Sequence, residues 1–363
     1  MTDTNEHNTT RSQPGLVQRF MRDTELDTRL LGMLGALALI WVGFHVYGAL
    51  SNGFGSFLTP RNLWNLSVQT ASIGIMACGM VLVIITRHID LSVGSVLGFC
   101  AVIMGITQVW FLPKLVGLEH WSIWIIACIV GMIAGTIVGA IHGWLIAYLS
   151  IPAFIVTLGG LLVWRGVAFL ITRGETISPL DSTFKLLGGG PNGAVGATGS
   201  WIVGIIAAIA VVAMIIMGRA RRKRFEFRLR PIWAEWFIGI ISVGAVIGAV
   251  LLVNAYPWPV GIVRRYAAAN DITIPEGGLY ISHGFAIPAL DELYVIAAAV
   301  IGGTSLSGGV GTIYGAVLGA FVMQSLQTGM VLIGFDAAVQ QVVVGGVLVL
   351  AVYLDNLYRR SSK

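Results

Sequence analysis

Residues 302–309 read Gly-Gly-Thr-Ser-Leu-Ser-Gly-Gly. This helix-breaking, hydroxyl-rich stretch stands between the apolar run Val295–Ile301 and a second apolar run that begins at Ile313. Every backbone N–H and C=O in a bilayer core needs an internal partner, so irregular backbone is tolerated there only inside protein or beside a water-filled cavity. A break of this kind between apolar runs therefore suggests a path for a hydrated solute.

The composition of the chain indicates a membrane protein. Of its 363 residues, 56% are hydrophobic and only 11% are charged. Soluble domains carry about 25% charged residues, so a soluble fold is excluded. The predicted fold class is an all-α integral membrane protein whose chain crosses the bilayer many times.

The apolar runs give the number of spans, because a bilayer core of about 30 Å requires roughly 20 apolar residues per helix. Full-length spans are predicted at residues 30–50, 66–86, 91–112, 123–148, 153–172, 200–218, 234–254, 311–333 and 338–354. Residues 293–303 are too few for an ordinary span and are predicted to form a short or broken helix that crosses or re-enters. The expected architecture is a bundle of about ten transmembrane or membrane-embedded helices over residues 30–355.

The distribution of cations predicts the orientation of the chain. Cations crowd the loop at residues 219–230 and the C-terminal tail at residues 356–363, and such residues are retained on the cytoplasmic side. Both termini are therefore expected in the cytoplasm, and the polar residues 1–29 form a tail and not a cleavable signal peptide. The same rule accounts for the net charge of +5, so we do not expect a nucleic-acid partner.

Two glycine ladders are predicted to be helix-packing surfaces. One ladder consists of Gly131, Gly135, Gly139 and Gly143, and the other of Gly311, Gly315 and Gly319. Small residues at every fourth position form a flat stripe that lets two helices approach closely.

Polar groups within the apolar regions are candidates for function, because they are costly in a membrane. The sharpest cluster is residues 87–95, Arg-His-Ile-Asp-Leu-Ser-Val-Gly-Ser, in which Asp90 or Ser92 is expected to cap the next helix. Arg165 interrupts the run 158–172 and requires a buried partner or a water-filled cavity. The candidate path or hinge residues are Asp90, Ser92, Ser95, Arg165, Thr304, Ser305 and Ser307. Helix capping and satisfaction of the loop backbone are the alternative roles of the hydroxyl and carboxylate groups in this set.

Catalytic and metal-binding motifs are not found. The chain lacks a His-Glu-x-x-His motif, a nucleophile elbow and a phosphate-binding loop, so any ATP must bind another subunit. Cys78, Cys100 and Cys128 all lie in apolar runs and predict neither disulfides nor a metal site. An intramembrane enzyme would need Ser305 or Ser307 beside a histidine such as His142 or His283, and no spacing supports that arrangement.

Three segments resemble one known family. Residues 89–95, Ile-Asp-Leu-Ser-Val-Gly-Ser, resemble the signature of the membrane permeases of bacterial ABC importers for ribose, xylose and related monosaccharides. Residues 151–159, continuing to Arg165 and Gly166, and the stretch 290–343 are similar to later landmarks of that family. The span at 234–254 and the segment 264–288 look most like the xylose-type branch.

The resemblance implies a mechanism and partners. It implies a homodimer in the bacterial inner membrane that works by alternating access, driven by two cytoplasmic ATPase subunits that bind ATP and Mg, with no cofactor on this chain. A periplasmic sugar-binding protein would dock near residues 173–200. A standalone secondary transporter or channel for a small polar solute is the alternative, but it would need coupling ions or protons, and intramembrane carboxylates are nearly absent.

One departure from the family concerns energy coupling. Members usually carry, before the Asp-Glu-Leu segment, a further span, a connector with Gly-Gly-Asn-x-x-Ala-Ala, and another span. Here Pro288 runs directly into Ala289. Because that connector resembles the element that docks on the ATPase, we hypothesise an internally shortened permease with impaired transport.

Overall fold

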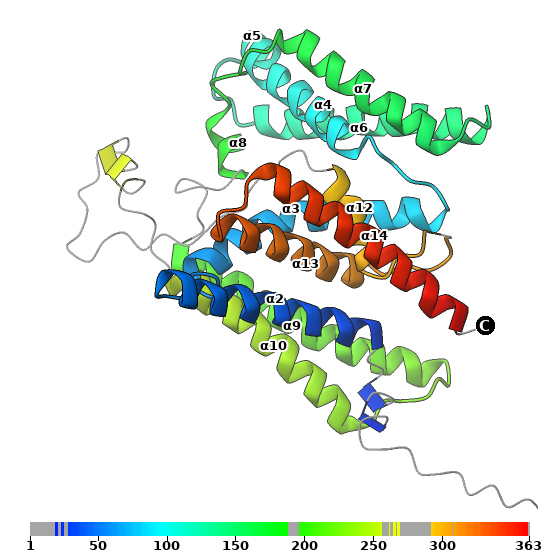
Figure 1. The fold of residues 1–363 in the computed structure, drawn as a ribbon. Coiled ribbons are helices and arrows are strands. Elements are labelled where there is room, and N and C mark those ends of the chain that lie inside the picture. The colour runs from blue at the N-terminus through cyan, green and yellow to red at the C-terminus, as the bar shows by residue number, and fades with distance from the viewer. Residues whose placement is uncertain are drawn as a thin grey trace, which may run out of the picture. The chain divides into compact units, whose positions relative to one another are not determined.

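A computed structural model describes residues 19–20, 23–24, 28–187, 196–255, 261, 264–265, 267–268, 292–306 and 308–361. The described residues form helices and loops without strands (Figure 1), which confirms the all-α class. The helices are α2 (Thr28–Asn52), α3 (Pro60–Ile85), α4 (Val93–Ile106), α5 (Leu112–Val116), α6 (Ile123–Ala147), α7 (Ala153–Thr172), α8 (Ser182–Leu187), α9 (Gly196–Arg224), α10 (Ile232–Ala255), α12 (Glu292–Ile301), α13 (Ile313–Leu332) and α14 (Ala337–Ser361). A π-helical turn, Thr107–Phe111, joins α4 to α5.

Eight helical segments of the described chain are long and apolar enough to cross a membrane. They correspond to the first eight predicted spans, and the apolar stretch of the ninth, Ala337–Tyr353, is shorter. The second span begins six residues before its predicted start at 66, because Pro60 occupies the first turn of α3 after an extended Thr59.

The chain divides into two compact units, which are described separately. The first comprises residues 1–32 and 202–249, and it contains most of α9 and α10. Within it, Arg219 Nη1 lies 2.7 Å from Glu235 Oε2, and the Phe20 ring contacts the rings of Trp233 and Phe237. The second unit comprises residues 33–201 and 250–363.

Helix α12 forms the centre of one helix group in the second unit. It contacts α3, α13 and α14 (Figure 1). Val295, Ala297, Ala298 and Ala299 are completely buried, with exposed fractions of 0%. A ten-residue helix spans about 15 Å, half of a bilayer core, so α12 is the short helix predicted at residues 293–303. Its loop therefore starts within a protein environment that can satisfy irregular backbone.

A second helix group of this unit consists of α4, α6 and α7. Helix α4 contacts both α6 and α7, and the latter two also contact each other (Figure 1). The connector between α3 and α4, residues 86–92, links this group to the group around α12.

Candidate functional site

The connector begins with a sharp reversal at the end of α3. Arg87 N–H donates to Ile84 O at 2.8 Å, and His88 N–H donates to Val83 O at 3.3 Å. These two bonds form a Schellman motif, which needs a left-handed residue after the helix. Arg87 takes that conformation with φ of 67°, a position that glycine usually occupies.

Asp90 fixes the turn that leads into α4. Its Oδ1 atom accepts from the backbone N–H of Ser92 at 2.7 Å and from the Ser92 hydroxyl at 2.6 Å. Ser92 occupies the N-cap position, but its side chain makes no capping bond. Of the two residues expected to cap α4, Ser92 therefore does not cap it, whereas Asp90 accepts the backbone N–H at the N-cap position in an Asx turn.

Helix α7 packs against this connector. The Thr157 hydroxyl donates to Ile89 O at 3.2 Å and also to Ala153 O of its own helix at 2.9 Å. A Cβ atom on Gly160 would lie 2.6 Å from His142 Cε1 and 3.4 Å from Ser92 Cβ. Glycine at 160 therefore permits the close approach of α7, and Ser92 is fully buried.

Two neighbouring residues of α7 have different environments. Trp164 Nε1 donates to His142 Nε2 at 3.1 Å, and its ring centroid lies 4.9 Å from that of Phe99. Arg165 is exposed in the single chain and does not belong to the buried cluster. Ser95, one turn into α4, is 2% exposed and does belong to it.

The loop that follows α12 is compact and hydrogen-bonded. Thr304 N–H donates to Ala299 O at 3.0 Å and closes the helix. Within the loop, Ser305 N–H donates to Val310 O at 2.8 Å, and Gly308 N–H donates to Ser305 O at 2.9 Å. The irregular backbone thus has internal partners, as burial in an apolar medium requires.

This loop meets the connector at the end of α3. Gly309 N–H donates to Ile85 O at 3.0 Å. A Cβ atom on Gly308 would overlap Arg87 Cγ and lie 2.9 Å from Ile85 O. Two polar segments that are more than 200 residues apart in sequence are therefore side by side, and the contact depends on a glycine.

The hydroxyl groups of this loop are deeply buried. Thr304 is 2% exposed and Ser305 is 0% exposed. The Thr304 Oγ1 atom has no hydrogen-bond partner. Ser307 lies outside the described residues.

The glycine ladder of α13 lies against α12. A Cβ atom on Gly315 would overlap Gly302 O, and one on Gly319 would overlap Ala298 O. A Cβ atom on Gly311 would lie 2.9 Å from Thr304 Cγ2. The structure thus brings the two backbones together at Gly315 and Gly319. Gly311 precedes α13 and lies beside the Thr304 side chain.

The ladder of α6 is divided between two environments. A Cβ atom on Gly131 would overlap Met104 Sδ, and one on Gly135 would lie 3.3 Å from Cys100 Sγ, both on α4. Gly139 and Gly143 have open space around the Cβ position. The second half of this ladder is therefore available to another surface.

Sequence reasoning missed several buried polar groups of the group around α12. Trp41 Nε1 donates to Ser325 Oγ at 2.8 Å. Gln324 is different, because a bond from its side chain across helices is expected from the sequence, and its Nε2 atom donates to Gln69 Oε1. The hydroxyls of Thr70 and Ser72 are buried without a partner. Their only signal in the sequence is that they are polar residues within apolar spans.

Comparison with known proteins gives a consistent family. A family model described as "Branched-chain amino acid transport system / permease component" matches residues 62–220. The xylose transport system permease protein of Escherichia coli (strain K12) is 34% identical, over 85% of this chain and 88% of that protein. No solved structure matches the chain.

Two further relatives carry related names. The L-arabinose ABC transporter permease protein of Azospirillum brasilense is 30% identical, over 91% of this chain and 90% of its own. The ribose import permease protein of Escherichia coli (strain K12) is 33% identical, over 83% of this chain and 87% of that protein. Members of such importers are transport subunits, and ATP hydrolysis belongs to a separate subunit. Together with its apolar helices and the signature at residues 89–95, these similarities show that the chain belongs to the multi-pass inner-membrane permeases of ABC sugar importers of the ribose and xylose type.

Proposed function

We propose that this permease serves an importer of xylose. The observation that carries the proposal is the 34% identity to a xylose permease over 85% of the chain. A second xylose permease, from Haemophilus influenzae, is 32% identical over 89% of the chain. The names of the arabinose and ribose relatives also contain pentoses, which supports a pentose as the substrate.

The buried polar cluster is proposed to act as a hinge during alternating access. Asp90, Ser92, Ser95, Thr304 and Ser305 are proposed as its members, because most of their side chains are enclosed by helices. The Gly309–Ile85 bond ties the loop after α12 to the connector after α3. A movement of one segment would therefore displace the other.

Ser307 and Arg165 are the two remaining candidates, and a different argument applies to each of them. Ser307 belongs to the same loop by sequence and is included with it. Arg165 is exposed on α7, so we propose that it faces the hydrated path, where a cation keeps its water. The ladder of Gly311, Gly315 and Gly319 would keep α12 and α13 together while the hinge moves.

Partners and orientation follow from the family and the charge distribution. We propose a homodimer with two cytoplasmic ATPase subunits, which hold ATP and Mg, and a periplasmic binding protein that docks near residues 173–200. Both termini and the Arg219 cluster would lie in the cytoplasm, on the rule that short basic loops stay inside.

Energy coupling is proposed to be impaired. The junction of Pro288 and Ala289, where relatives carry an ATPase-docking connector, lies outside the described residues. A permease without that connector would bind sugar and insert in the membrane but respond weakly to ATP.

Inserting the missing connector tests two of these proposals, the transport of xylose and the impaired energy coupling. The chain is expressed in a strain that keeps the ATPase and binding protein of a xylose importer but lacks the permease. A chimera carries the connector region of the Escherichia coli xylose permease between Pro288 and Ala289. We expect ATP-dependent xylose uptake by the chimera and lower uptake by the unaltered chain, at equal membrane insertion.

The outcomes distinguish the two proposals. No xylose uptake by a well-inserted chimera would contradict the xylose function, and equal uptake by both chains would contradict impaired coupling. Converting Thr304, Ser305 and Ser307 of the chimera together to alanine should reduce uptake and leave insertion intact. Ser67→Ala, at an exposed hydroxyl bonded to Leu63 of its own helix, is the matched control and should leave uptake unchanged.

A further inference from the structure

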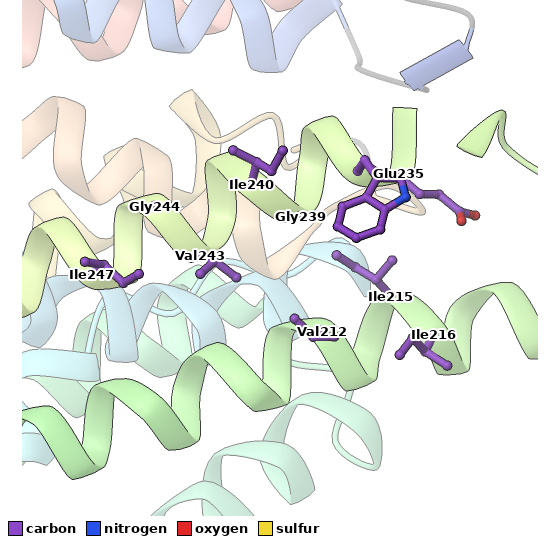
Figure 2. Close-up of a pocket in the computed structure, with 10 residues that line it drawn as sticks. Val212, Ile215, Ile216, Glu235, Gly239, Ile240, Val243, Gly244 and Ile247 are labelled. Atoms are coloured by element: carbon purple, nitrogen blue, oxygen red, sulfur yellow. The ribbon is translucent and has the colours of Figure 1, made fainter. Parts of the chain in front are cut away.

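A long apolar groove runs between α9 and α10 in the first unit (Figure 2). Its volume is about 630 Å³. Ile215 and Ile216 of α9 line it on one side, and Gly239, Val243 and Gly244 of α10 line it on the other. A cavity of this size is typical of a small-molecule site.

Two glycines keep the groove open. A Cβ atom on Gly239 would touch Ile215 Cδ1 at 3.5 Å, and one on Gly244 would meet nothing within 4 Å. A second, smaller groove of about 380 Å³ shares Val212, Ile216 and Val243 with the first. The surface thus offers two adjacent apolar channels with these shared side chains between them.

The groove ends at a strongly basic region. Glu235, a charged lining residue, is paired with Arg219 at 2.7 Å, so these two charges offset each other. The last turn of α9 then carries Arg221, Arg222, Lys223 and Arg224. Lys223 stands seven residues, or two turns, beyond Ile216 and therefore on the groove side of α9. Arg222 stands seven residues beyond Ile215 on the same side, and its Nη1 atom donates to Arg228 O at 3.3 Å. Arg221, five residues beyond Ile216, lies on a different side of the helix.

We propose that this groove binds an anionic phospholipid, with its acyl chains along the apolar channels and its phosphate beside Lys223. The class of ligand follows from the residues along α9, which are apolar where they line the groove and basic in the last turn. An acyl chain and an anionic headgroup have the same order. A cation near a membrane surface contributes about 1 kcal/mol to the binding of acidic lipid.

Native mass spectrometry of the purified full chain in detergent tests the proposal. The protein is titrated with phosphatidylglycerol or with phosphatidylcholine of the same acyl chains. We expect phosphatidylglycerol to be retained preferentially. Lys223→Gln should weaken its binding about fivefold, the equivalent of about 1 kcal/mol. Arg221→Gln makes the same charge change away from the groove and should alter binding by less than about twofold.

A second variant pair tests the groove itself. Gly244→Leu fills the channel and should reduce the retention of both lipids. Gly248→Leu is the matched control, because Gly248 also has open space but does not line either channel, and it should leave retention unchanged. The unfolding temperature of each variant shows that the fold is retained.

Three results would overturn the proposal. Equal weakening by Lys223→Gln and Arg221→Gln would show diffuse attraction without a site. Unchanged retention in Gly244→Leu would show that lipid does not occupy the groove. A change in oligomeric mass in Gly244→Leu without a change in lipid retention would assign the groove to a second copy of the chain.

Discussion

Gly308 and Gly309 have nearly the same positive φ, 82° and 80°, but different surroundings. An alanine at either position adopts an unfavourable left-handed conformation, which costs about 1–2 kcal/mol. Only at Gly308 would the added methyl group also overlap Arg87, which adds an overpacking cost of about 1–3 kcal/mol. We expect Gly308→Ala to lower the free energy of unfolding in detergent more than Gly309→Ala. Equal losses would contradict the close contact between the loop and the connector.

Thr304 provides a second prediction at the residue scale. An unpartnered buried hydroxyl costs about 1–3 kcal/mol, so the isosteric change Thr304→Val should raise the free energy of unfolding by about 1 kcal/mol. The matched control is Thr157→Val, which removes a hydroxyl that donates to Ala153 O at 2.9 Å and should lower it by about 1 kcal/mol. Both values come from unfolding titrations.

The effect of Thr304→Val on transport shows whether Thr304 acts as a hinge residue or contacts the solute through its hydroxyl. A hinge residue needs the shape of the side chain, which valine keeps, so sugar uptake by the chimera should persist. A loss of uptake in a variant with raised stability would instead show that the hydroxyl meets the solute or its water.

At the scale of elements, the two glycine ladders predict opposite responses to alanine. Gly315→Ala and Gly319→Ala would drive a methyl group into the backbone of α12, so we expect a loss of stability of about 1–3 kcal/mol or more. Gly139→Ala meets open space and should raise helix stability by up to about 1 kcal/mol. Unfolding measurements on the monomeric chain in detergent check both expectations.

The exposed half of the α6 ladder also tests the proposed homodimer. If a second copy packs on Gly139 and Gly143, Gly139→Ala should weaken dimerisation while stabilising the monomer. Sedimentation in detergent measures the dimer fraction. An unchanged dimer fraction would exclude this stripe from the interface.

At the scale of the whole molecule, the proposed orientation predicts a labelling pattern. Phe227 is 67% exposed in the basic loop between α9 and α10. In a chain whose Cys78, Cys100 and Cys128 are replaced by alanine, Phe227→Cys should react with a membrane-impermeant maleimide in inside-out vesicles but not in intact cells. Labelling in intact cells would reverse the orientation of the loop.

The sequence alone determined the fold class and most of the spans. Residues 153–172 were predicted as a span and form α7, and the short segment at 293–303 corresponds to α12, because a bilayer of fixed thickness demands apolar runs of fixed length. The resemblance to the family was also visible in the sequence, since each of the three segments that carry it is continuous along the chain.

Only the tertiary structure decided which polar groups meet. Nothing local in the sequence shows that Gly308 contacts Arg87, that Thr157 donates to Ile89, or that Thr304 lacks a partner. The two glycine ladders look alike in sequence, yet all three glycines of one lie close to neighbouring segments, whereas the other has open space around its second half. The physical reason is that each helix must match the thickness of the bilayer by itself, so its apolar length can be read from one segment. Contacts between helices depend instead on which backbones approach so closely that a methyl group would not fit between them.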